Sequence, residues 1–321
     1  MMEHLLAIII AVILDYFIGD PRWLPHPVRG MGMLISYLDR RFNDGEYRKL
    51  NGILTLFIVC LVAYAVSFTF IHMSYQLSTV LGIIVESIVI FTTIATKSLK
   101  DAAYEVYIPL KQGDLVSARK QLSMIVGRDT EQLDEGEVVR GCVETVAENI
   151  SDGITAPLFF ALIGGGTFAF VYRAVNTCDA MLGYKNETYI DFGWASARFD
   201  DLLNFLPARI TAFMIIFANV KLSPFSLKQC LKLLFRDAKK HPSPNSGWGE
   251  AAMAALLGVQ LGGVNTYKGV VSVRPKLGEP LVNLRKEHIC DAVNVMVRTV
   301  VAFIVLLCLG GILIEFAVTW S

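Results

Sequence analysis

The sequence predicts an all-α, polytopic integral membrane protein whose apolar helices are separated by helical polar segments. Of its 321 residues, 54% are hydrophobic and only 18% are charged. Soluble domains carry about a quarter charged residues, so the excess apolar surface must face lipid. A helix crosses the hydrocarbon with about 20 mostly apolar residues. Three segments meet that length, namely 52–72, 77–96 and 299–318.

The N-terminal run 5–19 predicts a further membrane anchor. It is shorter and contains Asp15, which would cost about 2.5–3.5 kcal/mol in the middle of a bilayer. Because Asp15 lies near the end of the run, its carboxylate can reach the interface. A cleaved signal peptide is the alternative, but the leader MMEH has no basic residue and no small-x-small cleavage site follows.

Two further apolar runs, 156–175 and 202–220, have two possible interpretations. The first contains three consecutive glycines at 164–166, and the second contains Pro207 and Arg209. Glycine and proline weaken a helix, and an arginine in lipid needs a partner. The runs are therefore either ordinary spans or broken helices that line a polar cavity.

Loop charge predicts the orientation in the cell membrane. The polar segments 20–51, 97–154 and 221–298 carry six, seven and twelve Lys/Arg respectively, so the positive-inside rule places all three in the cytoplasm. The polar stretch 176–201 would lie outside if both ambiguous runs crossed. Its polar residues, described below, argue against that position: if they share one site with Arg128 and Asp152, at least part of this pair should be re-entrant or buried.

The polar segments are themselves expected to be mostly helical. Apolar spacing predicts helices over 99–126 and 136–150, interrupted near Gly113 and Gly127, whereas the glycine- and proline-rich stretch 269–280 predicts a loop. No internal repeat or Gly/Ser linker is visible, which favours a single membrane-embedded domain over 1–321.

Composition excludes several functions. The 29 basic and 29 acidic residues balance, so no basic surplus points to a nucleic-acid partner. The six cysteines form no C-x-x-C pair and the five histidines are dispersed, which argues against a disulfide framework and a zinc site. No Walker A loop, Rossmann fingerprint, G-x-S-x-G elbow or H-E-x-x-H motif occurs.

A carboxylate-rich stripe is the strongest chemical signal. Arg140, Glu144, Glu148 and Asp152 are spaced by four, so on a helix they share one face. A solvated face with one Arg–Glu pair is the alternative. The stripe and the neighbouring Asn149 end at the start of an apolar run, where carboxylates are costly unless they are paired or bind a cation. Such carboxylates suit Mg²⁺, which bridges substrate phosphates.

Four other polar groups are candidate sites, each with a structural alternative. Arg128, Asp129 and Thr130 follow Gly127 and form either a turn or a phosphate site. The segment 241–250 contains Asn245 in a turn and Glu250 in the first turn of an apolar helix, either as a helix cap or beside an anion site. Prolines around His26 predict a rigid exit from the first run. A final group either pairs internally or forms a site: Arg173, Asn176, Asp179, Arg198, Asp200, Asp201 and Arg209.

These blocks together resemble the CbiB/CobD family, the membrane-bound adenosylcobinamide-phosphate synthases of cobalamin biosynthesis. The resemblance is ordered and covers about residues 14–270. One departure is Ser246, where the family more often has alanine. The resemblance is carried by GDPRWLPHPV (19–28), GRDT (127–130), ETVAENISDGITAP (144–157), RAVNTCDAMLGY (173–184), ARFDDLLNFLPAR (197–209) and NSGWGEAAMAALL (245–257).

The resemblance implies a ligase that consumes ATP and needs Mg²⁺. The amine of aminopropanol, or of its O-phosphate, would be joined to a carboxylate of adenosylcobyric acid, giving adenosylcobinamide or its phosphate. This chemistry needs a metal, phosphate-binding arginines and a base. We expect Glu148 and Asp152 to hold Mg²⁺, Arg128 and Arg173 to hold phosphates, and Glu144 or Asp179 to be the base. The remaining polar residues of these blocks are expected to contact substrate.

Two other functions are compatible with the sequence. A transporter for a corrinoid or its precursor would also combine polar residues with broken helices, but few spans and no inverted repeat are visible. A scaffold that gathers other cobalamin-pathway enzymes at the membrane would have no activity of its own. The expected partners are therefore the corrinoid and amine substrates, membrane lipid and possible pathway enzymes, with no nucleic acid.

Overall fold

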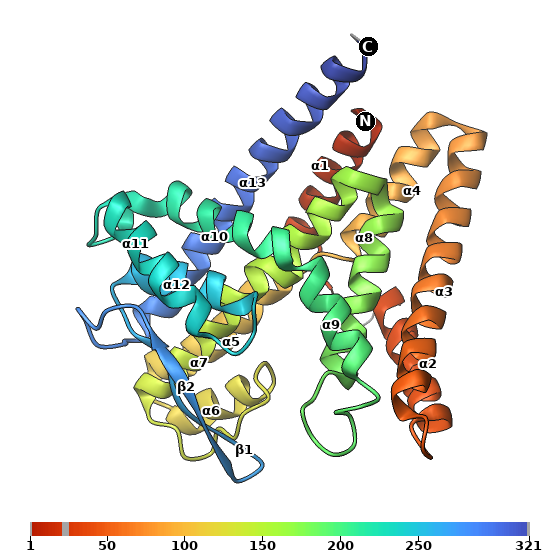
Figure 1. Ribbon diagram of the computed structural model, residues 1–321. Coiled ribbons are helices and arrows are strands. Elements are labelled where there is room, and N and C mark those ends of the chain that lie inside the picture. The colour runs from red at the N-terminus through yellow and green to blue at the C-terminus, as the bar shows by residue number, and fades with distance from the viewer. Residues whose placement is uncertain (1, 21–25, 320–321) are drawn as a thin grey trace. The chain divides into compact units, whose positions relative to one another are not determined.

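The computed structural model describes residues 2–20 and 26–319, and it is predominantly helical (Figure 1). The chain forms two compact units, each built from separate stretches of sequence. The first unit comprises the described parts of Met1–Lys97, Asp152–Asn204 and Ile304–Ser321, and the second comprises Ser98–Ser151 and Phe205–Phe303. A single membrane-embedded domain stays a prediction, and the units are treated separately below.

The first unit packs long apolar helices against one another. Helix α3 (Arg48–Leu77) contacts α4 (Thr79–Phe91) and α8 (Ala156–Leu182), while α1 (Met2–Phe17) packs on α4. Helices α2 (Pro27–Phe42) and α9 (Trp194–Leu203) complete the unit. Its core includes Ile35, Val59 and Phe192. A Cβ at Gly52 would lie 1.9 Å from the carbonyl oxygen of Phe192, so this packing requires glycine.

The buried Asp15 has a structural partner at the end of α1. Its carboxylate accepts a hydrogen bond from the backbone N–H of Thr96 at 2.9 Å, at the start of α5 (Thr96–Gln112). Lys97 Nζ donates in return to the carbonyls of Phe17 and Ile18, both at 3.1 Å. The Asp15 carboxylate therefore caps the start of α5, and Lys97 binds the free carbonyls at the end of α1.

Helix α8 is broken within the run 156–175, as one of the two interpretations required, while a polar cavity along it stays a prediction. Gly164 and Gly165 have non-helical backbone angles, and Gly165 has φ +65°. The next residue, Gly166, donates its N–H to the buried Glu86 carboxylate at 2.8 Å, and His4 and Tyr75 also bind that carboxylate, at 2.8 and 2.6 Å. The glycines thus allow the chain to restart a helix on an acidic cap.

The run 202–220 forms α10 (Phe205–Asn219) and a short 3₁₀ turn, η2 (Val220–Leu222). Pro207 lies in the first turn of α10, where its missing N–H costs no helical hydrogen bond. The proline therefore begins this helix and does not break it.

The second unit is arranged around α12 (Ser246–Leu257), which is buried on almost every side. It contacts α10, α11 (Leu227–Asp237), the 3₁₀ turn η3 (Ala238–Lys240) and α7 (Glu135–Ile150). A Cβ at Gly249 would lie 2.5 Å from the carbonyl oxygen of Ala147, so glycine lets α12 lie against α7. Helices α5, α6 (Leu115–Ser123) and α7 confirm the predicted helical segments 99–126 and 136–150. Helix α13 (Glu287–Thr319) ends the described chain.

The predicted loop over 269–280 is wrong. This stretch contains β2 (Val270–Leu277), which pairs antiparallel with β1 (Leu261–Tyr267). The two-residue turn uses Lys268 at φ 50° and Gly269 at φ 80°, the positive angles that tight hairpins require. The glycines and Pro275 concealed the alternation of valines along β2. This pair is the only sheet in the described chain, so the all-helical membrane class is otherwise confirmed.

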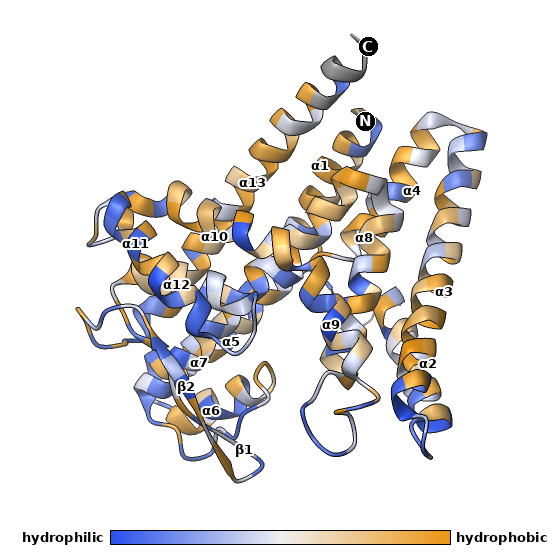
Figure 2. Cartoon of the chain, viewed as in Figure 1, coloured by the Kyte–Doolittle hydropathy of each residue, from blue (hydrophilic) through white to orange (hydrophobic). Residues whose placement is uncertain are grey.

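Five helical stretches are long and apolar enough to cross a membrane, as the orange ribbons of Figure 2 illustrate. They contain or overlap the three confident runs and the two ambiguous runs, whereas α1, with 16 residues, falls short of that length. They are Arg48–Leu77, Thr79–Gln112, Glu135–Leu182, Phe205–Leu222 and Glu287–Leu313. The chain is therefore a multi-pass membrane protein, and its orientation stays a prediction.

Around the predicted rigid exit, Pro21 and Pro25 lie outside the described residues. His26 immediately precedes α2 and lies with Nε2 3.2 Å from Oδ1 of Asp20. This contact gives His26 a structural partner at the start of α2.

Candidate functional site

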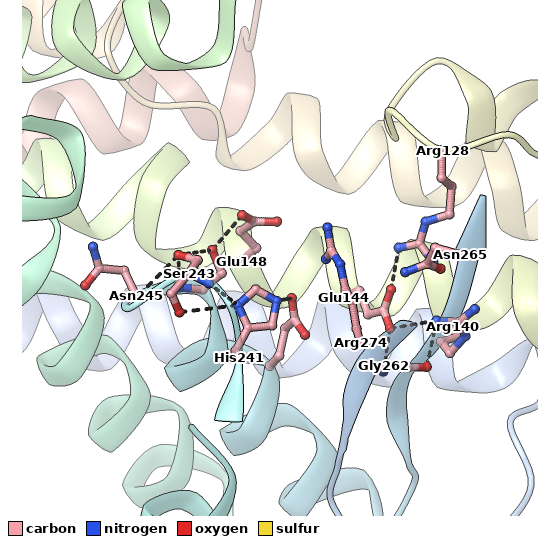
Figure 3. A network of polar contacts seen from close by, with 12 residues as sticks. Arg128, Arg140, Glu144, Glu148, His241, Ser243, Asn245, Gly262, Asn265 and Arg274 are labelled. Atoms are coloured by element: carbon pink, nitrogen blue, oxygen red, sulfur yellow. Dashed lines mark hydrogen bonds and ion pairs between the residues drawn. The ribbon is translucent and has the colours of Figure 1, made fainter. Parts of the chain in front are cut away.

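The buried carboxylate of Glu144 lies between two arginines on the face of α7 (Figure 3). Its Oε2 accepts a close hydrogen bond from Arg128, and its Oε1 accepts one from Arg140 Nη1 at 3.3 Å. The three side chains are only 5–7% exposed. A buried ion pair needs further hydrogen bonds to offset its desolvation.

The β-hairpin supplies those hydrogen bonds. Gly262 N–H donates to Glu144 Oε1 at 2.7 Å, and Arg140 donates to the carbonyls of Gly262 and Val264 at 2.7 and 2.9 Å. Arg128 Nη1 donates to Asn265 Oδ1 at 2.7 Å. This set of residues, hereafter the hairpin clamp (Arg128, Arg140, Glu144 and Asn265), therefore binds β1 to α7.

The turn that follows α6 also binds the hairpin. Asp129 accepts hydrogen bonds from the backbone N–H groups of Lys268 and Gly269 at 3.0 and 2.8 Å, and its own N–H donates to Thr266 at 2.8 Å. Thr130 is buried beside it. Arg128 and Asp129 thus have structural partners, and their predicted contact with phosphate stays a prediction.

A second cluster lies one turn further along α7 and joins it to α12. Glu148, half-buried, accepts a hydrogen bond at Oε1 from the Ser246 hydroxyl at 2.8 Å. Ser246 also lies 3.1 Å from the Ser243 hydroxyl, and the Ser243 N–H donates to His241 Nδ1 at 3.0 Å. His241 Nε2 then faces Glu250 Oε1 at 3.6 Å. We call these five residues the α7–α12 cluster (Figure 3).

Burial shifts the pKa values of the inner pair in opposite directions. The side chains of His241 and Glu250 are 6% and 2% exposed. Burial, reinforced by the negative charges of Glu144 and Glu148, raises the pKa of Glu250 well above its usual range. Burial, together with the positive charge of Arg274, lowers the pKa of His241. Each shift favours the neutral form of its group, so burial opposes an ion pair across this 3.6 Å approach.

The prediction that Glu250 lies in the first turn of its helix is wrong. Helix α12 begins at Ser246, which places Glu250 in the second turn, and it is buried against His241. It therefore cannot be the helix cap. The turn residue Asn245 is the N-cap, but its side chain makes no capping hydrogen bond.

Asn245 and Arg209 are brought together although 36 residues separate them. Arg209 Nη1 donates to Asn245 Oδ1 at 3.2 Å and also to the carbonyl of Phe205. Its guanidinium lies 3.6 Å from the centroid of the Phe205 ring and 4.9 Å from that of Trp248. Aromatic rings stabilise a partly desolvated guanidinium by about 0.5–2 kcal/mol.

In the first unit, one hydrogen-bond chain joins part of the third predicted group. Asn176 accepts from Arg173 Nη1 and donates to Asp200, both at 3.3 Å. Asp200 accepts from Asn204 at 3.0 Å, and Asn204 accepts from the Tyr172 hydroxyl at 2.7 Å. Nε of Arg173 is buried and has no partner within the described chain, so the guanidinium retains an unused donor.

The remaining predicted residues have the following positions. Arg198 is 69% exposed and lies 3.7 Å from Asp201, a weak surface pair. Asn149 donates to the carbonyl of Thr145 at 2.9 Å on its own helix. Asp179 is half-buried near the end of α8. Asp152 lies in a π-helical turn, Ser151–Thr155, and not on the α-helical stripe that the spacing predicted.

The carboxylate oxygens near Glu148 are too few to bind Mg²⁺ by themselves. They suit a Mg²⁺ ion that is also bound by the phosphates of a nucleotide. Within the residues that the structure describes, no group of three or more His, Cys, Asp or Glu could hold a metal ion. Mg²⁺ that arrives with phosphates needs only one or two carboxylates. Glu148 uses Oε1 for Ser246, and no residue of the described chain donates to its Oε2. Asp152 belongs to the other unit, so joint ligation stays a prediction.

Several residues of these networks were missed by sequence reasoning. Arg274 on β2 was placed in a supposed loop, and Ser243 and Tyr172 had no pattern of their own. Tyr172 is 1% exposed and its hydroxyl joins Asn204 to the carbonyl of Asp152, at 3.2 Å from the latter. For Ser243 and Tyr172 the signal available was position, because each lies inside or next to a motif that was identified, whereas Arg274 had no such signal.

Fold and site define a class: a multi-pass helical membrane protein with buried clusters of carboxylate, arginine and histidine. The model of the family described as CobD/Cbib protein matches residues 8–296, and the chain belongs to that family. A cobalamin biosynthesis protein CobD of Halalkalibacterium halodurans is 56% identical over 308 residues, covering 96% of this chain and 97% of the relative. Proteins of the same name from Leptospira interrogans and Clostridium perfringens are 44% and 43% identical, each covering more than nine tenths of both chains. No solved structure is significantly similar.

Proposed function

We propose that the chain acts in cobalamin biosynthesis as an ATP-dependent ligase. It would join aminopropanol, or its O-phosphate, to the carboxylate of adenosylcobyric acid. Membership of the CobD/Cbib family and similarity to named cobalamin biosynthesis proteins over nearly the whole chain support the pathway. The α7–α12 cluster supports the reaction type, because amide formation needs carboxylates and a proton acceptor at one place.

Glu148 carries this proposal more directly than Glu144. Both carboxylate oxygens of Glu144 accept hydrogen bonds, from Arg128, Arg140 and the Gly262 N–H, so this residue has little capacity left for a substrate. Glu148 is half-buried and has one oxygen available. Glu148 would therefore hold the cation or accept a proton from the incoming ammonium, while Ser246 orients its carboxylate.

Phosphate binding is assigned to the arginine that has an unused N–H donor. Arg173 retains a buried, unused donor, whereas Arg128 is bound to Glu144 and Asn265. Arginine is well suited to phosphate because its donors form a fixed fork. Mg²⁺ and ATP, when bound, would neutralise phosphate charge and activate the corrin carboxylate.

The test is a turnover assay on the purified full-length chain in detergent. Corrinoid, amine and ATP are supplied, and the amide product is measured by mass spectrometry with aminopropanol and with its O-phosphate. Glu148→Gln should reduce kcat by at least about a hundredfold, the lower range for loss of general acid–base catalysis. Glu137→Gln is the matched control, since Glu137 lies on the same helix but is 41% exposed.

Three results would distinguish the functions. ATP-dependent product in detergent supports the ligase. Uptake of corrinoid into sealed vesicles without product would support a transporter, and the absence of both activities would support a scaffold. Wild-type turnover in Glu148→Gln would remove Glu148 from the mechanism.

A further inference from the structure

A cavity of about 340 Å³ in the second unit is lined by none of the predicted site residues. Its walls are the leucines Leu256 and Leu257 of α12 and a polar stripe on α13. Small-molecule pockets have volumes of about 300–1,000 Å³. Leu257 lies seven residues from Glu250 on the same helix, about 10 Å along the axis. The cavity is therefore at the other end of α12 from the α7–α12 cluster.

Two opposite charges, Asp291 and Arg298, line this cavity together with the buried His288, which interacts electrostatically with Asp291. Asp291 and Arg298 are exposed, and neither makes a hydrogen bond or ion pair within the described residues. They are seven positions apart on α13, so they lie on one face two turns from each other. Helical side chains lean toward the N-terminus, which brings the guanidinium of Arg298 toward the turn of Asp291. Asn294 lies between them on the same wall. This arrangement suits a ligand with one anionic and one cationic group.

The cavity lies at the end of two apolar stretches. Arg298 directly precedes the apolar run 299–318, and Val301, one turn further, is 58% exposed. Leu222, which also lines the cavity, ends the candidate span Phe205–Leu222 and is 50% exposed. Much of helix α13 is coloured orange in Figure 2. Charged side chains at the end of apolar helices mark the level of the lipid headgroups.

We propose that this cavity binds the headgroup of a phospholipid that carries a primary ammonium group. Arg298 binds the phosphate and Asp291 binds the ammonium. The order of Asp291 and Arg298 along α13 favours a lipid. In such a headgroup the phosphate lies closer to the acyl chains than the ammonium group does. Arg298 is likewise adjacent to the apolar run, and Asp291 is two turns away from it. A free amino-alcohol phosphate has the same two groups but no acyl chain to fix their order. This inference does not depend on the proposed ligase activity.

The experiment measures lipid retained by the full-length chain in detergent by native mass spectrometry. Phosphatidylethanolamine and phosphatidylglycerol are added in equal amounts. The wild type should retain phosphatidylethanolamine about tenfold more than phosphatidylglycerol, the effect of one charge-assisted hydrogen bond. Asp291→Asn should remove this preference, and Arg298→Gln should weaken retention of both lipids while Arg298→Lys restores part of it. Arg285→Gln and Glu287→Gln, which change nearby charges outside the cavity, should leave retention unchanged.

Equal retention of the two lipids by the wild type overturns the proposal, as does an unchanged preference in a folded Asp291→Asn protein. Melting temperatures in detergent establish that each variant is folded. Binding of 1-amino-2-propanol O-phosphate without retention of phosphatidylethanolamine also overturns it, because the site would then belong to a free amine. Loss of ligase turnover with normal lipid retention leaves the lipid site supported and contradicts only the proposed function.

Discussion

At the scale of single residues, Glu144 and Glu148 are one helical turn apart on α7 but have different surroundings. Glu144 receives hydrogen bonds from two arginines and a backbone N–H, while Glu148 receives one from a serine. The first environment stabilises the hairpin, and the second leaves a carboxylate oxygen available. The spacing of four predicted their shared face but not this division, which depends on a hairpin that begins more than a hundred residues later.

Replacement of Glu144 by Gln should destabilise the protein strongly. Two buried arginines would lose their counter-charge, and breaking such a buried pair costs about 3–5 kcal/mol. Glu137→Gln, which removes only the 41%-exposed partner that lies 3.7 Å from Arg140, should cost less than about 1 kcal/mol. Thermal unfolding in detergent measures both, and equal melting temperatures would show that the hairpin clamp does not stabilise the fold.

The pair Glu250 and His241 predicts two opposite pH dependences. A glutamate whose pKa is raised by folding adds stability that is complete below its unfolded pKa and is lost as the pH rises through the folded pKa. A histidine whose pKa is lowered adds stability that is complete above its unfolded pKa of about 6.5 and is lost as the pH falls through the folded pKa. The slopes cannot exceed about 1.4 kcal/mol per pH unit for each group.

Melting curves between pH 5 and 8 measure this. The stability of the wild type relative to Glu250→Gln should fall as the pH rises, and relative to His241→Gln it should rise. If the stability of the wild type and of Glu250→Gln changes with pH in parallel, the Glu250 carboxyl has the same pKa in the folded and the unfolded state, which would contradict this prediction.

At the scale of elements, the break in α8 depends on glycine at one position. Gly165 has φ +65°, and a Cβ there would lie 2.3 Å from the Glu86 carboxylate. Gly165→Ala should therefore lower the melting temperature, since both backbone strain and displacement of Glu86 oppose it. Gly310→Ala is the matched control, because nothing lies within 4 Å of its added Cβ, and alanine should stabilise that helix by about 0.5–1 kcal/mol. A Gly165→Ala protein as stable as the control would contradict this account of the break.

The sequence allowed the helices to be predicted better than the hairpin or the networks. Apolar runs of about 20 residues are a local signal, and the structure has helices at all of them. The hairpin was missed because turn residues dominate its composition, and Arg274 was missed with it. Asp152 was placed on an α-helical stripe, but a π-turn alters the spacing there. The pairing of Arg209 with Asn245 and of Glu148 with Ser246 depends on tertiary packing, which spacing along one segment cannot predict.

At the scale of the whole molecule, the topology around the broken helix can be tested by cysteine labelling. We predict that 176–201 faces the cytoplasm, so Asn186→Cys should react with a membrane-impermeant maleimide only after cells are permeabilised. Gln76→Cys, near the end of α3 in the stretch 72–76 that contains no Lys or Arg, should react in intact cells. Both positions are exposed in the structure. Labelling of Asn186→Cys in intact cells would place this segment outside and separate it from the cytoplasmic segments.

The central claim is that this membrane protein forms an amide bond, and product formation by the purified chain tests it most directly. The chain in detergent is incubated with adenosylcobyric acid, ATP, Mg²⁺ and each amine in turn, and the corrinoid products are weighed by mass spectrometry. We predict a product whose mass equals that of the acid plus the amine minus water, formed only with ATP and lost in Glu148→Gln and in Asp152→Ala while membrane insertion is retained. A folded wild-type preparation that binds corrinoid but gives no such product with either amine would contradict the claim.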